Sequence, residues 1–275
     1  MAAALAFTVM TTLIRHVATE IHPFEIGFFR ALTNLLLMVP FVVRNGISIL
    51  KTDGQGIYVL RGLIGLVFLM SYFSGAAMIP VANSQALIFT SPLLAAVLAV
   101  LVLGEVIRAR RIAALLVGLA GAAIILRPGL TEFSIGAGLV LIGALANASS
   151  NIIVKFKTRT DHPDTVVFYL ALYVTPLILV PALFVWQWPN AEQLMYLIAI
   201  GFSATLNQRF LSRAFAATDA TAVVPFDFAR LPFAAAIGFA VFGELPDIWV
   251  WVGGIVIFTA SVYLIHREAV AARAE

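Results

Sequence analysis

An acid and a base lie within an otherwise apolar stretch of this sequence, residues 221–242. Asp227 and Arg230 are three residues apart, so a helix would place both side chains on one face. A stretch of this length can span a bilayer, where a charge near the centre costs at least ~2.5–3.5 kcal/mol. The pair should therefore face protein or a water-filled cavity. It is either an ion pair that neutralises itself and locks helix packing, or a polar site on a route across the membrane.

Other polar or aromatic side chains fall deep inside apolar stretches and could line the same route. On a helix, Asn147, Ser150 and Asn151 share one face, and Ser149 points away from it. The alternative role for such residues is interhelical hydrogen bonding, worth ~0.6 kcal/mol each on average in membranes. The candidate substrate-binding residues are Asp227, Arg230, Arg209, Asn207, Asn147, Asn151, Tyr72, Ser84, Gln85 and Phe226.

Three further arginines lie in or near the ends of apolar stretches. Arg209 and Arg213 are one helical turn apart; Arg213 is expected to reach the membrane surface, and Arg209, a turn deeper, to meet Asp227 or an anionic group. Arg30 lies about two turns into its stretch, and we expect it to reach outward in a structural role.

The composition indicates a membrane protein. Of the 275 residues, 62% are hydrophobic and only 11% are charged, whereas a soluble domain carries about 25% charged residues. There is no cysteine, which excludes disulfides, thiol catalysis and cysteine metal sites. No basic segment precedes the first apolar stretch, which disfavours a cleaved signal peptide.

Apolar stretches long enough for transmembrane helices number ten. They are predicted at residues 2–19, 24–44, 55–79, 82–103, 111–126, 134–155, 165–187, 191–214, 220–242 and 248–266. The fold class is therefore an all-α membrane protein of ten transmembrane helices.

The basic residues predict how these helices are oriented. With the N-terminus inside, thirteen Lys and Arg residues fall at inside loops and span ends: Arg44, Lys51, Arg61, Arg108, Arg110, Arg111, Lys155, Lys157, Arg159, Arg209, Arg213, Arg267 and Arg273. Only Arg15 and Arg127 fall outside. Because cytoplasmic loops are enriched in Lys and Arg, both termini are predicted to be cytoplasmic.

The sequence also repeats at a spacing of about 140 residues. His22-Pro23 recurs as His162-Pro163, Pro92 corresponds to Pro232, and Gly104-Glu105 corresponds to Gly243-Glu244. We expect each of these two glycines to end its helix and each glutamate to reach free N–H groups at the start of the next helix. Five spans precede the join, so the second half starts from the opposite side of the membrane. We predict two inverted five-helix repeats, residues 1–130 and 131–275, an arrangement typical of secondary transporters with a site between the halves. Pro92 and Pro232 would bend their spans beside the site and act in gating.

Ten spans in two halves, with a Gly-Glu after the fourth span of each, resemble the drug/metabolite transporter superfamily. The His22-Pro23-Phe24-Glu25 stretch and the 225–232 segment resemble most closely its EamA-type bacterial exporters of amino acids, aromatic ones included, and of other metabolites. The resemblance implies a central pocket lined by spans 1, 3, 4, 6, 8 and 9. The first span lacks the glutamate used by the four-span multidrug exporters of the superfamily, so their proton-coupling scheme does not carry over.

The function expected from these features is export of small metabolites, most simply amino acids, across the inner membrane by alternating access. Export of cationic drugs or nucleotide-type metabolites is the alternative, and an intramembrane enzyme or scaffold is the alternative of another class. No hydrolase, zinc-protease or phosphate-loop motif occurs, so we expect no enzyme, cofactor or metal. The expected partners are a small-molecule substrate and the lipid bilayer, with no nucleic acid, for a monomer or homodimer.

Overall fold

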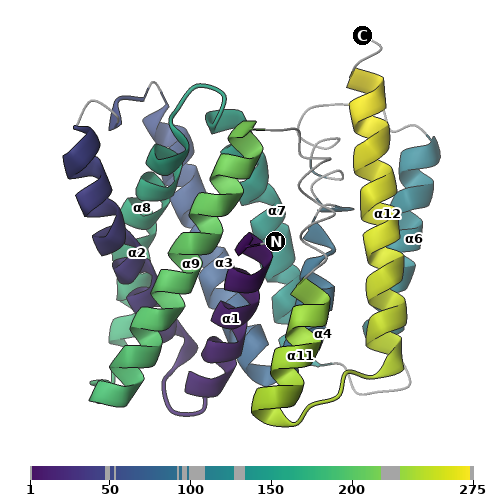
Figure 1. Ribbon diagram of the computed structural model, residues 1–275, viewed down its shortest axis with the longest axis horizontal. Helices are drawn as coiled ribbons and strands as arrows, with labels where there is room; N and C mark the ends of the chain where they lie inside the picture. Colours follow the sequence, from purple (N-terminus) through teal and green to yellow (C-terminus); the bar gives the residue numbers. More distant parts are fainter. Residues whose placement is uncertain are drawn as a thin grey trace.

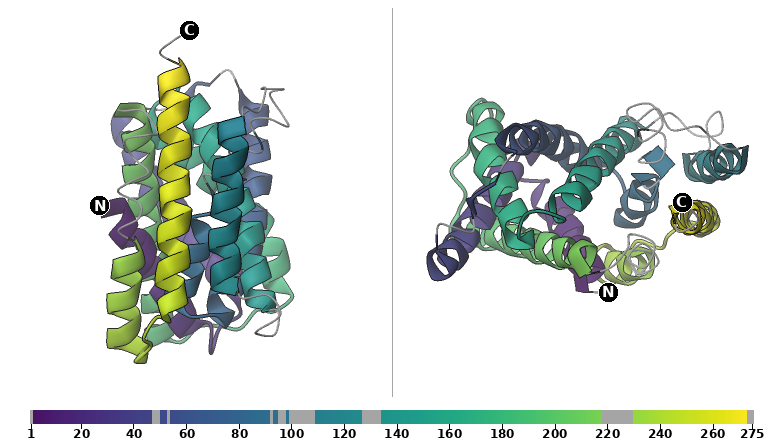
Figure 2. Two further views of the ribbon diagram at one scale, coloured as in Figure 1. Left: turned by 90° about the vertical axis from the view of Figure 1, so that its right-hand side faces the viewer. Right: turned by 90° about the horizontal axis from the view of Figure 1, so that it is seen from above.

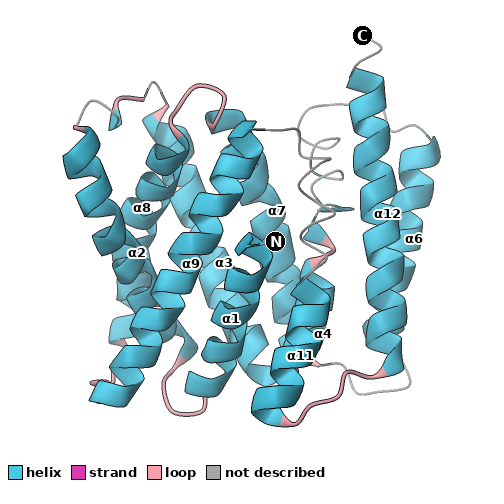
Figure 3. Ribbon diagram, in the orientation of Figure 1, coloured by secondary structure: helices cyan, strands magenta, loops and turns pink. Residues whose placement is uncertain are grey.

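The computed structural model describes residues 2–46, 50–52, 54–91, 93–94, 98, 109–126, 134–217 and 230–272 (Figure 1). Its helices are α1 (Ala2–Val17), α2 (Pro23–Asn45), α3 (Gln55–Met78), α4 (Val81–Ile88), α6 (Ala109–Leu126), α7 (Ile135–Lys157), α8 (Pro163–Leu183), α9 (Ala191–Ala217), α11 (Arg230–Phe242) and α12 (Ile248–Ala272). Within the described ranges there is no strand (Figure 3). The all-helical class is confirmed.

Each predicted span coincides with one of these helices, and the differences lie at the ends. The helix expected from residue 165 begins at Pro163, and the one expected to stop at residue 266 continues to Ala272. For the span predicted at 82–103 the structure gives the helix α4, and for the span predicted at 220–242 it gives the helix α11. Pro92 and residues 95–97, 99–103 and 220–229 of these two spans lie outside the described residues.

Two matching helix starts support the internal duplication. The side chain of His22 accepts a hydrogen bond from the backbone N–H of Phe24, and that of His162 accepts one from Asp164. Both histidines have nearly the same backbone angles, φ −62° and ψ 137° against φ −63° and ψ 138°. A proline follows each at the first helical position, where its missing N–H costs no helical bond.

Contacts between helices repeat in the same way. α3 packs on α7 as α9 packs on α1; α2 packs on α9 as α8 packs on α3; and α4 packs on α7 as α11 packs on α1. α2 contacts α8, and α6 contacts α12. Exchanging α1, α2, α3, α4 and α6 for α7, α8, α9, α11 and α12 therefore reproduces this contact pattern.

The two sets of helices run in opposite directions. α1 descends in Figure 1 to the side where Glu20 bonds Gln193 and Glu25 bonds the backbone of Gln187. α7 instead rises to the other side, where Asp161 accepts a hydrogen bond from Thr52. The duplication is thus inverted, and the two bundle ends each gather turns from both sets.

The surface of the bundle suits a lipid environment. By length and composition, α2, α3, α7 and α8 are able to cross a membrane, and shorter apolar segments lie in α1, α6, α11 and α12. Large apolar side chains are exposed on the outer surface of many helices; they include Leu36, Leu60, Leu116, Ile142, Val180 and Ile198. In water so many exposed apolar groups would be unfavourable, whereas lipid accommodates them.

The turn after α11 corrects one detail of the sequence interpretation. Gly243 has a φ of +68°, as expected for a residue that ends a helix in the left-handed conformation. Glu244 does not reach the start of the next helix: its carboxylate pairs with Arg15 near the end of α1. The N–H of Trp249 in α12 is instead bonded by Asp247, at 3.3 Å.

A buried carboxylate joins the 50–54 segment to the turn between α7 and α8. Asp161 accepts hydrogen bonds from Thr52 at 2.6 Å and Tyr58 at 2.7 Å, and it pairs with Lys157 at 3.1 Å. Burial alone would raise the pKa of Asp161, but these bonds and one from Thr160 together hold its pKa below the ordinary value of 3.8.

Asp161→Asn should therefore lower the free energy of unfolding by about 2 kcal/mol at neutral pH, through lost bonds to a charged group. A carboxylate with a lowered pKa stabilises the fold at pH values above its unfolded-state pKa, and this stabilisation disappears as pH falls through the lower folded-state pKa. The melting-temperature difference between wild type and variant in detergent should be full at pH 7 and shrink below pH 3.8. Glu192→Gln, at an exposed carboxylate, is the control; a difference independent of pH would contradict this account.

The orientation of the bundle is open to a direct labelling test, because the chain has no cysteine of its own. A cysteine introduced at Gly46 or Thr158 should be shielded from an impermeant external thiol reagent in intact cells. A cysteine at Asn190 should react. The reverse pattern would refute the predicted cytoplasmic location of both termini.

Candidate functional site

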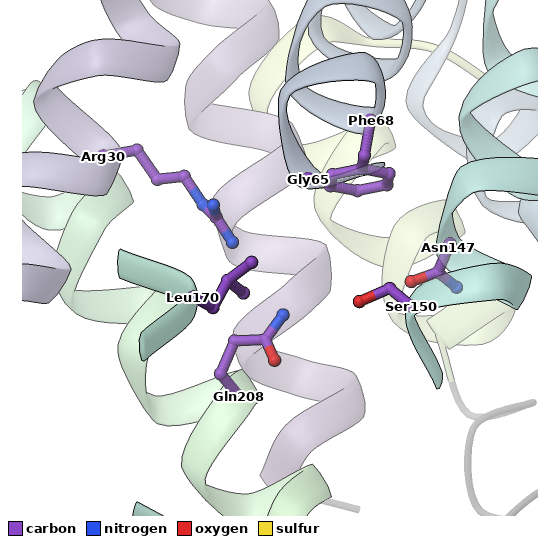
Figure 4. Close-up of a pocket in the computed structure, with 7 residues that line it drawn as sticks. All are labelled: Arg30, Gly65, Phe68, Asn147, Ser150, Leu170 and Gln208. Atoms are coloured by element: carbon purple, nitrogen blue, oxygen red, sulfur yellow. The ribbon is translucent and has the colours of Figure 1, made fainter. Parts of the chain in front are cut away.

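A small cavity, of about 20 Å³, lies between helices of the bundle (Figure 4). It lies among α2, α3, α7, α8 and α9, and it is lined by Arg30, Gly65, Phe68, Asn147, Ser150, Leu170 and Gln208. Both sets of helices contribute to it, as expected of a site between inverted repeats.

The α7 side of the cavity follows from helical spacing. Asn147 and Ser150 line it, whereas Ser149 is half-buried and bonds the Leu145 carbonyl of its own helix. Two of the three residues that the sequence placed on one face therefore line the cavity, and Asn151 does not. Across the cavity, Gly65 is required by close packing, because a Cβ there would lie 2.7 Å from the side chain of Val174.

Arg30 enters the cavity from α2. Its side chain was expected to reach outward, and this is wrong: Arg30 is only 5% exposed and points inward, with the Gln208 amide facing the same space (Figure 4). Its Nε is buried without a hydrogen-bond partner. α2 packs against α8 and α9 along this face, so the direct path to the surface is filled by protein.

Arg61 contacts a residue that lines the cavity, Ser150. It is fully buried, less than two turns from the start of α3. Its Nε donates to Ser150 Oγ at 3.2 Å, and its Nη1 donates to the Val166 carbonyl. Arg61 therefore joins α3 to α7 and α8, and it adds a second positive charge close to Arg30.

A buried polar network adjoins the cavity. The Thr11 hydroxyl on α1 lies 3.0 Å from the Tyr72 hydroxyl and accepts a hydrogen bond from Gln85 Nε2, also at 3.0 Å. Gln85 Oε1 is buried without a hydrogen-bond partner. Phe68 connects the two regions: it lines the cavity and stacks on the Tyr72 ring, with centroids 5.1 Å apart.

Arg230 lies beside this network. Its guanidinium carbon is 4.2 Å from the centre of the Phe7 ring, and its carbonyl accepts a hydrogen bond from Thr8. The structure thus brings Tyr72, Gln85 and Arg230 into one neighbourhood through α1, which supplies threonines that the sequence interpretation overlooked. Their spacing at residues 8, 11 and 12 was the available signal.

Arg209 meets an acid that the sequence interpretation did not name. Its Nε donates to Asp164 Oδ1 at 2.8 Å, and Arg213 donates to the other oxygen at 3.1 Å. Asp164 is 1% exposed and begins α8, so these pairs tie α8 to α9. The Nδ2 of Asn207 donates to the carbonyl of Ala3, which joins α9 to α1.

The remaining candidates are dispersed or lie outside the described residues. Ser84 is buried and bonds the Val81 carbonyl of its own helix. Asn151 is half-buried, and Pro232 is exposed; neither lines the cavity. Asp227, Phe226 and Pro92 lie outside the described residues.

The helices around the central cavity differ in part from those expected. The resemblance implied spans 1, 3, 4, 6, 8 and 9, but α2 and α8, the second and seventh spans, contribute Arg30 and Leu170. Spans 1, 4 and 9 instead carry the adjoining network. A second hollow, of about 240 Å³, lies at one end of the bundle between α4, α11 and the 243–247 turn.

Comparison with known proteins agrees with this architecture. The chain is 30% identical to the S-adenosylmethionine uptake transporter of Rickettsia prowazekii over 92% of this chain and 86% of the relative. It is 30% identical to the riboflavin transporter of Vibrio cholerae over 99% and 93%, and 29% identical to the pseudopaline exporter of Pseudomonas aeruginosa over 95% and 93%.

A protein of known crystal structure has the same fold, with a TM-score of 0.66 over 100% of this chain and 98% of the other, at 16% identity. The model of the EamA-like transporter family matches twice, at residues 1–127 and 134–266. Its members are transporters, which confirms that the chain is not an enzyme. The chain therefore belongs to the EamA-like transporter family, and it is a multi-pass membrane protein and secondary transporter of small metabolites.

Proposed function

We propose that this protein exports amino acids and related metabolites, aromatic ones included, across the bacterial inner membrane. The central cavity is the observation that carries the proposal. It offers a cation, two amides and a hydroxyl for a polar head group, and the Phe68 ring for an apolar or aromatic part of the same molecule. An enzyme needs only one catalytic site and no second, inverted half. Alternating access instead requires a site lined by residues from both inverted halves.

The halves 1–130 and 131–275 would rock about the cavity and expose it to each side in turn. The protein would act as a monomer or homodimer. Cationic drugs suit the cavity poorly, because Arg30 and Arg61 supply positive charge and no described lining residue is acidic.

A second candidate is uptake of S-adenosylmethionine or riboflavin, which the similarity to uptake and riboflavin transporters favours. The carboxylate and the aromatic base of S-adenosylmethionine suit the cavity, but its sulfonium cation does not suit a site with two arginines, whereas riboflavin carries no positive charge. The two candidates share the site and differ in the substrate and in the direction of net flux.

Counterflow in proteoliposomes separates them. Vesicles loaded with unlabelled L-phenylalanine, S-adenosylmethionine or riboflavin would be assayed for accumulation of the same labelled compound, with protein-free vesicles as the control. Accumulation with phenylalanine supports the first candidate, and accumulation only with one of the others replaces it with the second. Counterflow with none of the three, in a folded protein, would argue against both substrate assignments.

A further inference from the structure

We infer that the central cavity binds the anionic group of the substrate, a carboxylate or a phosphate, against the guanidinium of Arg30. This inference rests on the proposed transport function and specifies the substrate chemistry of the same site. Arg30 is 5% exposed, its Nε has no hydrogen-bond partner, and its guanidinium faces the cavity (Figure 4). A buried donor of this kind is costly unless something accepts from it.

The local charge balance calls for an anion. Arg61 is fully buried next to Arg30, and its Nη2 also lacks a hydrogen-bond partner. In the part of the chain that the structure describes, neither arginine forms an ion pair. Two buried cations without a carboxylate are unfavourable at membrane depth, and an anionic ligand would relieve them.

The acids on neighbouring helices are engaged elsewhere. Glu25, on the same helix as Arg30, accepts from the backbone N–H of Gln187 through Oε2 at the end of the bundle, and it forms no ion pair with Arg30 among the described contacts. Asp164 on α8 holds Arg209 and Arg213, and it cannot serve Arg30 without giving up these contacts.

Neutral groups complete the site. Ser150 Oγ accepts the hydrogen bond from Arg61, so its own proton remains available to donate. Asn147 uses one amide hydrogen to bond Ser91 Oγ at 3.3 Å and has a second. With Gln208 opposite, an anion in the cavity would meet donors from α2, α7 and α9, which belong to both halves.

The test uses two ligand pairs that each differ by one anionic group. L-phenylalanine is compared with L-phenylalaninamide for the carboxylate, and riboflavin 5′-phosphate with riboflavin for the phosphate. Binding to the purified protein in detergent would be measured from the ligand-induced rise in melting temperature and by calorimetry. The variants are Arg30→Gln, Arg30→Lys and, as a matched control, Arg44→Gln, which removes an exposed cation from the same helix.

In one pair, the member with the carboxylate or phosphate should bind wild type and Arg44→Gln about ten- to hundredfold more tightly than the member without it. This preference should vanish in Arg30→Gln and survive in part in Arg30→Lys. The ligand pair that shows this preference tells whether the site binds a carboxylate or a phosphate. Since Arg30→Gln removes an unpaired buried charge, it should fold at least as well as wild type, and its own melting temperature checks this.

Equal binding of both members of each pair to wild type would overturn the anion site, as would a preference that persists in Arg30→Gln. Neither result touches the transport function, which the counterflow assay decides separately. If the protein transports a neutral compound, and Arg30→Gln transports it at the wild-type rate, the protein is still a transporter. Arg30 would then not be part of its substrate site.

Discussion

Gly253→Ala should lower the free energy of unfolding by about 2–3 kcal/mol, because overpacking forces rigid groups apart. A Cβ at Gly253 on α12 would lie 2.5 Å from the Gly121 carbonyl oxygen and 2.5 Å from Ile125 Cγ1 on α6. A backbone oxygen cannot turn aside, so the two helices must separate. They form a pair at one end of the molecule (Figure 2), with few other contacts to absorb the shift.

Gly238→Ala is the matched control, since a Cβ at that helical glycine meets nothing within 4 Å. Alanine is the better helix former there, so the control should be neutral or stabilising by about 0.5–1 kcal/mol. Melting temperatures of the two variants in the same detergent would be compared with wild type. Equal effects at the two positions would mean that the close crossing of α6 and α12 is not present in the protein.

Asp164→Asn should destabilise the protein by about 2 kcal/mol. Breaking a buried ion pair usually costs ~3–5 kcal/mol, but water screens part of this charge because the Arg209 and Arg213 side chains are 29% and 53% exposed. Thermal unfolding in detergent measures the change. Arg213→Gln, which removes the more exposed partner, should cost less than half as much.

The same variants decide the role of Arg209. If it mainly holds α8 to α9, Arg209→Gln lowers the melting temperature and leaves counterflow largely intact, and adding it to Asp164→Asn costs less than the sum of the two. If Arg209 instead binds substrate, transport is lost while stability is unchanged. The geometry favours the first outcome, because Asp164 already accepts from Arg209 at 2.8 Å.

Sequence patterns were sufficient for most of the fold. Apolar stretches located the helices because a bilayer requires long segments whose backbone bonds are satisfied internally. The 140-residue spacing identified the duplication, since His22 and His162 cap their helices in the same way. Helix ends were less accurate because capping and fraying, rather than hydrophobicity, decide them.

The site was harder to predict, because a one-dimensional pattern does not say which helix faces which. Spacing within α7 placed Asn147, Ser150 and Asn151 on one face, and the first two line the cavity. Arg30 was missed because its distance from the outer surface allowed it to reach outward, and only the packing of α2 on α8 and α9 rules that out. Likewise, Arg209 pairs with Asp164, a pairing fixed by tertiary contacts that no spacing within one helix indicates.

The most direct test of the account is to fill the cavity and measure transport. Gln208→Trp adds bulk to the cavity lining. Phe210→Trp, two residues along the same helix, introduces the same residue at an apolar position that is 40% exposed. Counterflow of the substrate identified in the proteoliposome screen should be abolished in Gln208→Trp and close to wild type in Phe210→Trp, and melting temperatures would show that both variants are folded. Wild-type counterflow in a folded Gln208→Trp protein would show that the substrate does not pass through this cavity.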